Sequence, residues 1–382
     1  MSLRFPPVLV GVSALLAIPA ALAADRVQVV TSFSILADMV ENVGGEHVEV
    51  TSLVGPDSDT HIYSPSPGDA RALAEADLVV FNGLLLEGWM DRLLESSEYQ
   101  GELIVATDGI DKLDYHPHDH GHDHGHAHEQ GYDHSHDHAH EHDHEHSHEH
   151  DHEHSHEHDH EHSHDHEHEH GHDHAHDHVH GEFDPHAWQD MEQARVYIAN
   201  IRDGLIDADE ENADDYRANA ERYLDEMAKL DGEIRELISD IPPSTSVITG
   251  HDSFGYFSNA YGVRFLSPVG LSTEAEPTGA GMAELVDLIN EQSVEALFHE
   301  NMTNQAVIDQ LAEETGVGVA GTLYADSLAS KGEASTYLGM MRHNAELLHE
   351  ALAQPGHGET VAEHDHTHDH GHDHDHEHEH SH

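Results

Sequence analysis

The sequence predicts an α/β protein made of two Rossmann-like lobes that are joined by one long α-helix. Short apolar strands alternate with amphipathic helices in two separate series. Between the two series lies a stretch of some 28 residues that keeps helical spacing without a break. We therefore expect a first lobe over residues 24–212, a linking helix over 213–240 and a second lobe over 241–355.

The first series contains strand-like runs bounded by turn residues and helical segments with apolar spacing. The expected strands are VQVVTSF (27–33), HVEVTSLV (47–54), DLVVFNG (77–83) and ELIVAT (102–107). The expected helices are SILADMVENVGG (34–45), which ends at glycine, PGDARALAEA (67–76), EGWMDRLLESS (87–97) and the segment 190–209.

The second series begins where prolines 242 and 243 end the linking helix. It repeats the same alternation up to a closing helix. The expected strands are SVITG (246–250), VRFLSPV (263–269), VEALFHE (294–300) and VGVAGTLYA (317–325), and the expected helices cover 253–262, 281–292, 304–316 and 335–352. Ligands in such sheets bind beyond the carboxyl ends of the strands, so the cleft between the lobes is the expected site.

The first 23 residues have the pattern of a cleaved secretory signal peptide. One basic residue, Arg4, precedes an apolar run that ends at the small-residue exit Ala21-Leu22-Ala23. The run is shorter than the roughly 20 residues that a transmembrane helix needs. We expect an exported, periplasmic protein that does not itself span the membrane.

The composition excludes several classes of function. Cysteine is absent, so a disulfide, a thiolate metal site and a cysteine nucleophile are all ruled out within this sequence. The formal net charge is −64 with only 14 Lys plus Arg, which argues against a nucleic-acid partner. Any transition-metal site must therefore use imidazole and carboxylate ligands.

Most of the 49 histidines lie in two low-complexity tracts. An insert at 116–180 carries 31 of them, at alternate positions, and a tail between His364 and His382 carries another 10. Because neither face of such an alternating segment is apolar, we expect the insert and the tail (356–382) to be disordered without metal. As a flexible chain the insert spans about 45 Å, enough to reach a neighbouring site.

Four polar residues outside the tracts are candidate metal ligands. His61 lies in the loop PDSDTHIYSPSP, His186 in FDPHAW, His251 in VITGHDSFGYF and Asp326 in TLYADSL. We interpret all four as residues at strand exits, where they face the cleft, and four N/O ligands complete the tetrahedral shell that zinc prefers. The other histidines lack this context: His47 and His299 are expected to be ordinary packed or edge residues, the i, i+6 spacing of His343 and His349 does not suit a shared ligand face, and His357 belongs to the tail.

The motifs HIYSPSP, DPHAW, GHDSFGYFSNAYG and GTLYADSL resemble those of the periplasmic metal-binding proteins that serve zinc or manganese ABC importers. The resemblance covers essentially the whole chain after the signal peptide. It implies a rigid linking helix and one metal ion held between the lobes by His61, His186, His251 and Asp326. It also implies an ABC permease as partner, with a periplasmic zinc chaperone as a further candidate, and a monomeric protein that is not an enzyme.

The resemblance also bears on the choice of metal. Manganese members of the family usually have Glu at the position of His251, so histidine there favours zinc, which imidazole suits better than it suits Mn²⁺. Three neutral imidazoles, one carboxylate and Zn²⁺ give a net charge of about +1. The insert is then a low-affinity zinc trap beside this site, with a dispensable solubilising tract as the alternative. Three alternatives to zinc delivery remain open: delivery of manganese or iron, a metal buffer that uses the His-rich tracts alone, and a zinc hydrolase with Glu300 or Asp252 as base.

Overall fold

The computed structural model describes residues 26–115, 182–275, 277–292 and 294–353. The expected signal peptide, His-rich insert and His-rich tail lie outside these residues. Within them, no helix is both long enough and apolar enough to cross a membrane. The described residues before and after the insert fall in one compact unit.

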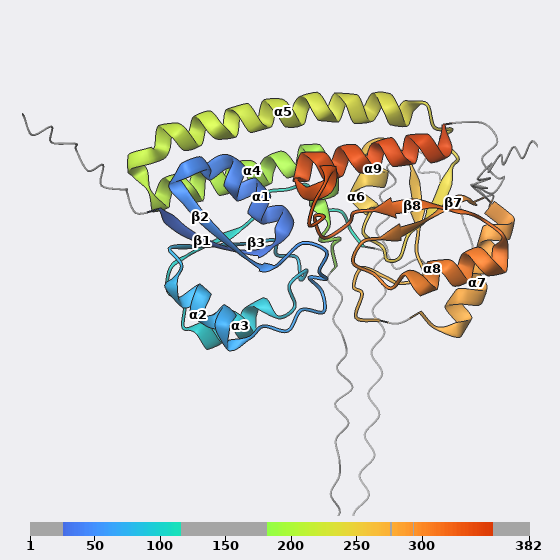
Figure 1. Cartoon of the computed structure of the whole chain (residues 1–382), viewed down its shortest axis with the longest axis horizontal. Coiled ribbons are helices and arrows are strands. Elements are labelled where there is room, and N and C mark those ends of the chain that lie inside the picture. Colours follow the sequence, from blue (N-terminus) through green and yellow to red (C-terminus); the bar gives the residue numbers. More distant parts are fainter. Residues whose placement is uncertain (1–25, 116–181, 276, 293, 354–382) are drawn as a thin grey trace, which may run out of the picture. The chain divides into compact units, whose positions relative to one another are not determined.

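The first lobe is built on a four-stranded, all-parallel sheet in the order β2-β1-β3-β4 (Figure 1). Consecutive parallel strands need crossover helices, and the chain supplies one after nearly every strand. The strands are β1 (Val27–Phe33), β2 (Val48–Val54), β3 (Leu78–Phe81) and β4 (Glu102–Val105). The helices are α1 (Ser34–Gly44), α2 (Pro67–Glu75), α3 (Met90–Ser97) and α4 (Met191–Ala208), with 3₁₀ turns η1 (Gly45–His47) and η2 (Ala187–Gln189).

The second lobe repeats this plan with the order β6-β5-β7-β8, again all parallel. Its strands are β5 (Ser246–Ile248), β6 (Arg264–Leu266), β7 (Val294–Glu300) and β8 (Val319–Leu323). Its helices are α6 (Gly255–Tyr261), α7 (Gly279–Gln292), α8 (Gln305–Thr315) and α9 (Tyr337–Leu352), with the 3₁₀ turn η4 (Glu333–Ser335). The predicted fold of two parallel-sheet α/β lobes is confirmed.

The linking helix α5 (Ala213–Ser239) has 27 residues and follows the 3₁₀ turn η3 (Glu210–Asn212). At 1.5 Å per residue it is about 40 Å long. It packs against α1 and α4 of the first lobe and against α6 and α9 of the second (Figure 1). Its buried residues recur every three or four positions, which places them on one face: Tyr216, Ala220, Tyr223, Met227, Leu230, Ile234 and Ile238.

The hydrophobic core ties α5 to both lobes. One buried cluster runs from the first sheet through α4 and α5 to Met340 and Met341 of α9. A smaller cluster around Leu285 and Leu297 lies between the second sheet and helices α7 and α8. Because the larger cluster is shared, pulling the lobes apart would expose apolar surface on both of them.

Candidate metal centre

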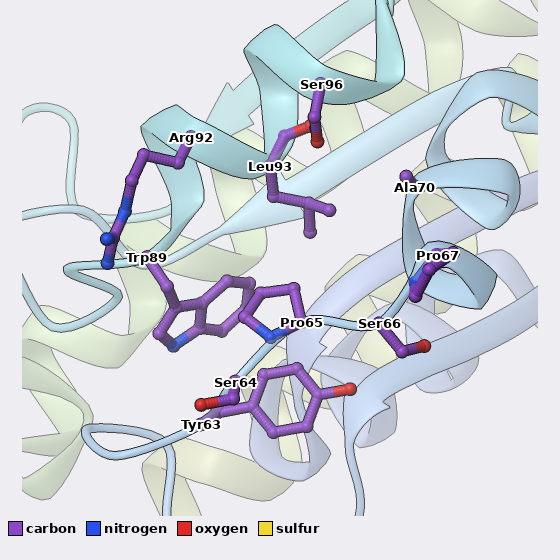
Figure 2. Close-up of a pocket in the computed structure, with 10 residues that line it drawn as sticks. All are labelled: Tyr63, Ser64, Pro65, Ser66, Pro67, Ala70, Trp89, Arg92, Leu93 and Ser96. Carbon is purple, nitrogen blue, oxygen red and sulfur yellow. The ribbon is translucent and has the colours of Figure 1, made fainter.

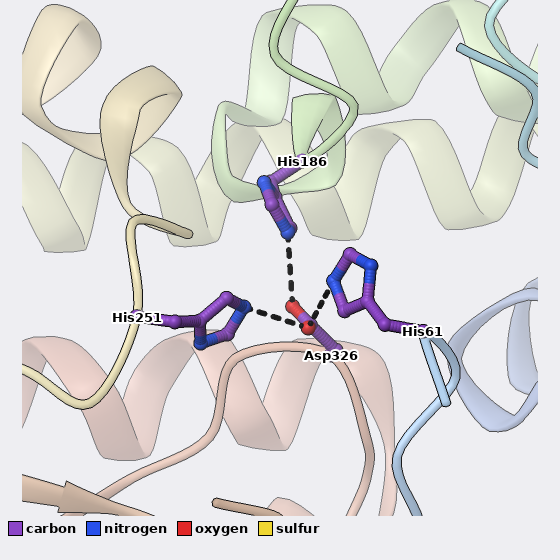
Figure 3. A group of neighbouring side chains, drawn as sticks. All are labelled: His61, His186, His251 and Asp326. Atoms are coloured by element: carbon purple, nitrogen blue, oxygen red, sulfur yellow. Dashed lines mark ion pairs between the residues drawn. The ribbon is translucent and has the colours of Figure 1, made fainter. Parts of the chain in front are cut away.

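Four loops bring the predicted ligands to one place (Figure 3). His61 lies on the loop after β2, His251 follows β5 and Asp326 follows β8, as the strand-exit interpretation requires. That interpretation is wrong for His186, which directly precedes η2 and follows an isolated antiparallel bridge between Asp114 and Phe183 rather than a strand of the sheet. The loop on which His186 lies follows the insert in the sequence and reaches the other three candidate ligands without a strand.

The candidate ligand atoms lie within 4.8 Å of one another. Nε2 of His61 and Nε2 of His251 lie 3.2 Å and 2.9 Å from Oδ2 of Asp326, and Nε2 of His186 lies 3.5 Å from its Oδ1. His61 is 7% exposed and the other three are fully buried. The three imidazole nitrogens thus surround a single carboxylate, and Figure 3 shows the three rings directed at it from separate loops.

Apart from the ion pairs that they form with one another, these five atoms have no partner in the described residues: Nε2 of each histidine and both oxygens of Asp326. Buried polar atoms are normally hydrogen-bonded, so five of them that face only one another need an explanation. A cation with nitrogen and oxygen ligands at about 2.0–2.2 Å would satisfy them together. The donor set therefore fits a small divalent metal ion.

A buried carboxylate orients the His251 imidazole. Oε2 of Glu300, at the end of β7, lies 2.6 Å from Nδ1 of His251, and its Oε1 accepts the His251 backbone N–H at 3.0 Å. Because a carboxylate accepts, Nδ1 carries the hydrogen and the lone pair of Nε2 is left for a metal.

A second carboxylate does the same for His186. Oδ1 of Asp184 accepts from Nδ1 of His186 at 2.7 Å and from its backbone N–H at 2.9 Å. The loop is held further by Asn82, whose Nδ2 donates to the Pro185 carbonyl at 2.9 Å, and Tyr197 donates to Oδ1 of Asn82 at 2.7 Å. The position of His186 is therefore fixed by buried polar groups of its own lobe.

His61 is held differently, through its main chain. Its N–H donates to Oδ1 of Asp59 at 2.8 Å, and the preceding carbonyl, that of Thr60, accepts from Nε1 of Trp89 at 2.8 Å. None of the described residues hydrogen-bonds Nδ1 of His61, in contrast to the other two imidazoles.

Burial and neighbouring charges shift the pKa values of these side chains in different directions. Burial alone would lower the pKa of His251, but the carboxylates of Glu300 and Asp326 raise that pKa well above its usual value. Burial would raise the pKa of Asp326, but the neighbouring His251 and His186 hold it well below its usual range. For His61, desolvation prevails and lowers the pKa. At neutral pH the metal-free cluster thus contains an ionised Asp326, a protonated His251 and a neutral His61.

Asp184 and Glu300 each orient a candidate ligand, a role that the sequence interpretation missed. The sequence suggests Glu300 only as a hydrolase base, yet its carboxylate is bound to His251. The available signal for Asp184 was its place two residues before His186 in FDPHAW. Counting both carboxylates with Asp326 and a divalent ion gives +2 − 3 = −1 for the centre, rather than the +1 expected from the ligands alone.

The other described histidines lie elsewhere. Each pairs with a group outside the cluster: His47 with Asp215 at 3.0 Å, His299 with Asp309 at 2.9 Å, His349 with Asp240 at 3.3 Å and His343 with the Thr322 carbonyl at 3.1 Å. His357 lies outside the described residues.

A separate cavity of about 550 Å³ lies between α2, α3 and the loop after His61 (Figure 2). Tyr63 and Trp89 form part of its wall, with ring centroids 5.1 Å apart. It holds no cluster of potential metal ligands, and its link to the metal centre is the hydrogen bond from Trp89 to the Thr60 carbonyl.

Comparison with known proteins identifies the family of the chain. A family model described as zinc-uptake complex component A, periplasmic (ZnuA) matches residues 29–351. The manganese-binding lipoprotein MntA of Bacillus subtilis is 30% identical over 335 residues, 86% of this chain and 90% of the relative. The iron-binding protein YfeA of Yersinia pestis is 26% identical over 335 residues, 87% of this chain and 88% of the relative.

Among solved structures, the periplasmic zinc-binding protein TroA of Treponema pallidum superimposes with a TM-score of 0.67. It is 23% identical and covers 86% of this chain and 100% of its own, a likeness that establishes the fold. Since the family model spans most of the sequence, the chain belongs to the ZnuA family of metal-binding solute-binding proteins of ABC metal importers.

Proposed function

We propose that this protein captures Zn²⁺ with high affinity through His61, His186, His251 and Asp326 and delivers it to the permease of an ABC importer. The observation that carries the proposal is the convergence of three buried imidazole nitrogens on one buried carboxylate, with no hydrogen-bond partner from outside the cluster in the described residues. Transport explains this arrangement better than hydrolysis does. A catalytic zinc needs an open position and a base, whereas Glu300 and Asp184 are both bound to imidazoles.

Zinc is favoured over manganese by the chemistry of the donors. Three nitrogens and one carboxylate suit Zn²⁺, while Mn²⁺ prefers oxygen ligands. The carboxylates on Nδ1 of His186 and His251 make those imidazoles stronger donors, which favours the ion with the greater affinity for nitrogen. Manganese or iron delivery is the second candidate, because curated relatives carry the names manganese-binding and iron-binding.

A competition titration separates these candidates. We expect one Zn²⁺ per chain to stay bound when Mn²⁺ or Fe²⁺ is added in large excess, and His251→Ala to abolish this tight binding while weak binding by the His-rich tracts persists. If the protein were a metal buffer that used only the His-rich tracts, His251→Ala would leave its metal binding unchanged.

The remaining parts of the proposal concern segments outside the metal centre. We propose a cleaved signal peptide (1–23), a periplasmic location, and lobes at 24–212 and 241–355 around a linking helix at 213–240. The insert (116–180) acts as an auxiliary zinc trap. Deleting it should remove weakly bound ions and slow zinc capture at low concentration, yet leave the single tight ion in place.

A further inference from the structure

The segment 55–60, which leads from β2 to His61, makes hydrogen bonds to the second lobe. The Asp57 N–H donates to the Leu328 carbonyl at 2.9 Å, and Oδ2 of Asp57 accepts the Ser330 N–H at 3.0 Å. Four residues after Asp57 the chain reaches His61, one of the candidate metal ligands. His61 follows a strand of the first lobe, but the segment that leads to it is hydrogen-bonded to the second lobe.

Asp59 makes a further hydrogen bond between the lobes, and this one involves the main chain of His61 directly. One oxygen, Oδ1, accepts the backbone N–H of His61 at 2.8 Å. The other, Oδ2, accepts the hydroxyl of Thr273 at 2.6 Å, a residue 214 positions away on the loop after β6. A single carboxylate therefore joins the main chain of His61 to the second lobe.

The rings of the two other imidazoles are each oriented by a carboxylate of their own lobe. Asp184, from the same loop, orients His186, and Glu300, from the same sheet, orients His251. The His61 ring has no carboxylate on Nδ1 among the described residues, and His61 is also the most exposed of the four ligands. Of the three histidines it is the one that can rotate away at the lowest cost.

We propose that His61 is the ligand that leaves first when the metal is released, and that the Asp59–Thr273 hydrogen bond is the latch that retains it. This inference rests on the zinc function proposed above. Asp59 acts as a positioning residue, because it sets the main chain of His61, and Thr273 supplies the latch from the second lobe. Slight separation of the loops after β2 and β6 would break the latch and free His61, while His186 and His251 keep their orienting carboxylates.

Thr273→Val in the full-length protein tests the latch, because valine keeps the shape and removes the hydroxyl donor. With one equivalent of Zn²⁺ loaded and excess chelator added, we expect the slow dissociation rate to rise about ten-fold, as the loss of a hydrogen bond to a charged group implies. Thr273→Ser should restore the wild-type rate. Thr315→Val, which removes a hydroxyl bonded to the Leu311 carbonyl in α8, is the matched control and should change nothing.

Two further measurements separate a latch from a general structural role. The unfolding midpoint of the metal-free protein and the visible spectrum of the Co²⁺ complex should be the same in Thr273→Val and wild type. In a His61→Ala background Thr273→Val should no longer accelerate dissociation, since its effect passes through His61. Equal acceleration with and without His61, or no acceleration in the wild-type background, would overturn the latch. Absence of a tight Zn²⁺ ion in the wild type would instead overturn the proposed function.

Discussion

Nε1 of Trp188 donates a hydrogen bond to the carbonyl oxygen of Ala325, 2.9 Å away, and so joins the loop of one ligand to the loop of another. Trp188 lies two residues after His186, and Ala325 immediately precedes Asp326. Both residues are buried. The spacing between a first-lobe imidazole and the second-lobe carboxylate is thus set by a direct contact between the lobes.

Trp188→Phe should weaken zinc binding, because it removes this bond while keeping an aromatic ring in the core. A neutral hydrogen bond contributes about 1 kcal/mol, so we expect the Kd to rise about five-fold in a chelator competition assay. Tyr99→Phe, which removes a hydroxyl bonded to the Glu102 carbonyl far from the centre, serves as control. An unchanged Kd in Trp188→Phe would show that the bond does not set the spacing.

Glu300→Gln should reduce zinc affinity although all four ligands remain. The change removes the negative charge that orients the His251 ring and strengthens it as a donor, and losing such a partner typically costs about 10–100-fold in metal affinity. Isothermal titration with a competing chelator measures the loss. Affinity equal to that of wild type would mean that Glu300 has only a structural role.

Zinc binding near neutral pH should release the proton held by His251, since metal binding must displace protons from its ligands. The raised pKa of His251 means that this ring holds a proton in the metal-free protein, whereas the lowered pKa values of His61 and Asp326 leave them nothing to release. Affinity should therefore fall as the pH falls. Calorimetry in buffers of different ionisation enthalpy counts the protons, and a count of zero would contradict the charge state assigned to His251.

The same raised pKa predicts how pH affects the metal-free protein. A proton on His251 stabilises the folded state fully below the usual histidine pKa of 6.5, and this stabilisation is lost as the pH rises through the raised value. Thermal unfolding of the metal-free protein should accordingly show declining stability above neutral pH. His251→Gln should remove this decline. A decline that persists in the variant would have to come from other groups.

His251→Glu should not by itself convert the protein to manganese binding. The new carboxylate would lie beside Glu300 in a buried site. Two neighbouring negative charges there oppose the ionisation of both carboxyl groups. His251→Glu combined with Glu300→Gln removes this repulsion and supplies the additional oxygen ligand that Mn²⁺ prefers. We expect Mn²⁺ to compete with Zn²⁺ better in the double variant than in either single one. If Mn²⁺ competed with Zn²⁺ equally well in the single and double variants, this expectation would be wrong.

Much of the fold follows from local pattern. The strand VEALFHE, predicted for 294–300, is β7 (Val294–Glu300), and the long helical stretch is α5. The parts that pattern could not supply are pairings between distant segments. Glu300 and His251 are 49 positions apart, and Asp59 and Thr273 are 214 apart, so neither contact leaves a local signal. His186 illustrates the same limit, because its place beside Asp326 depends on a loop with no strand before it.

The most direct test of the zinc centre is X-ray absorption at the zinc edge on protein that lacks residues 116–180 and 356–382 and carries one Zn²⁺ per chain. We predict three imidazole nitrogens and one carboxylate at about 2.0–2.2 Å, and loss of the tightly bound Zn²⁺ ion in His251→Ala. A first shell of oxygen ligands, or failure of the shortened protein to retain one tight Zn²⁺, would contradict it.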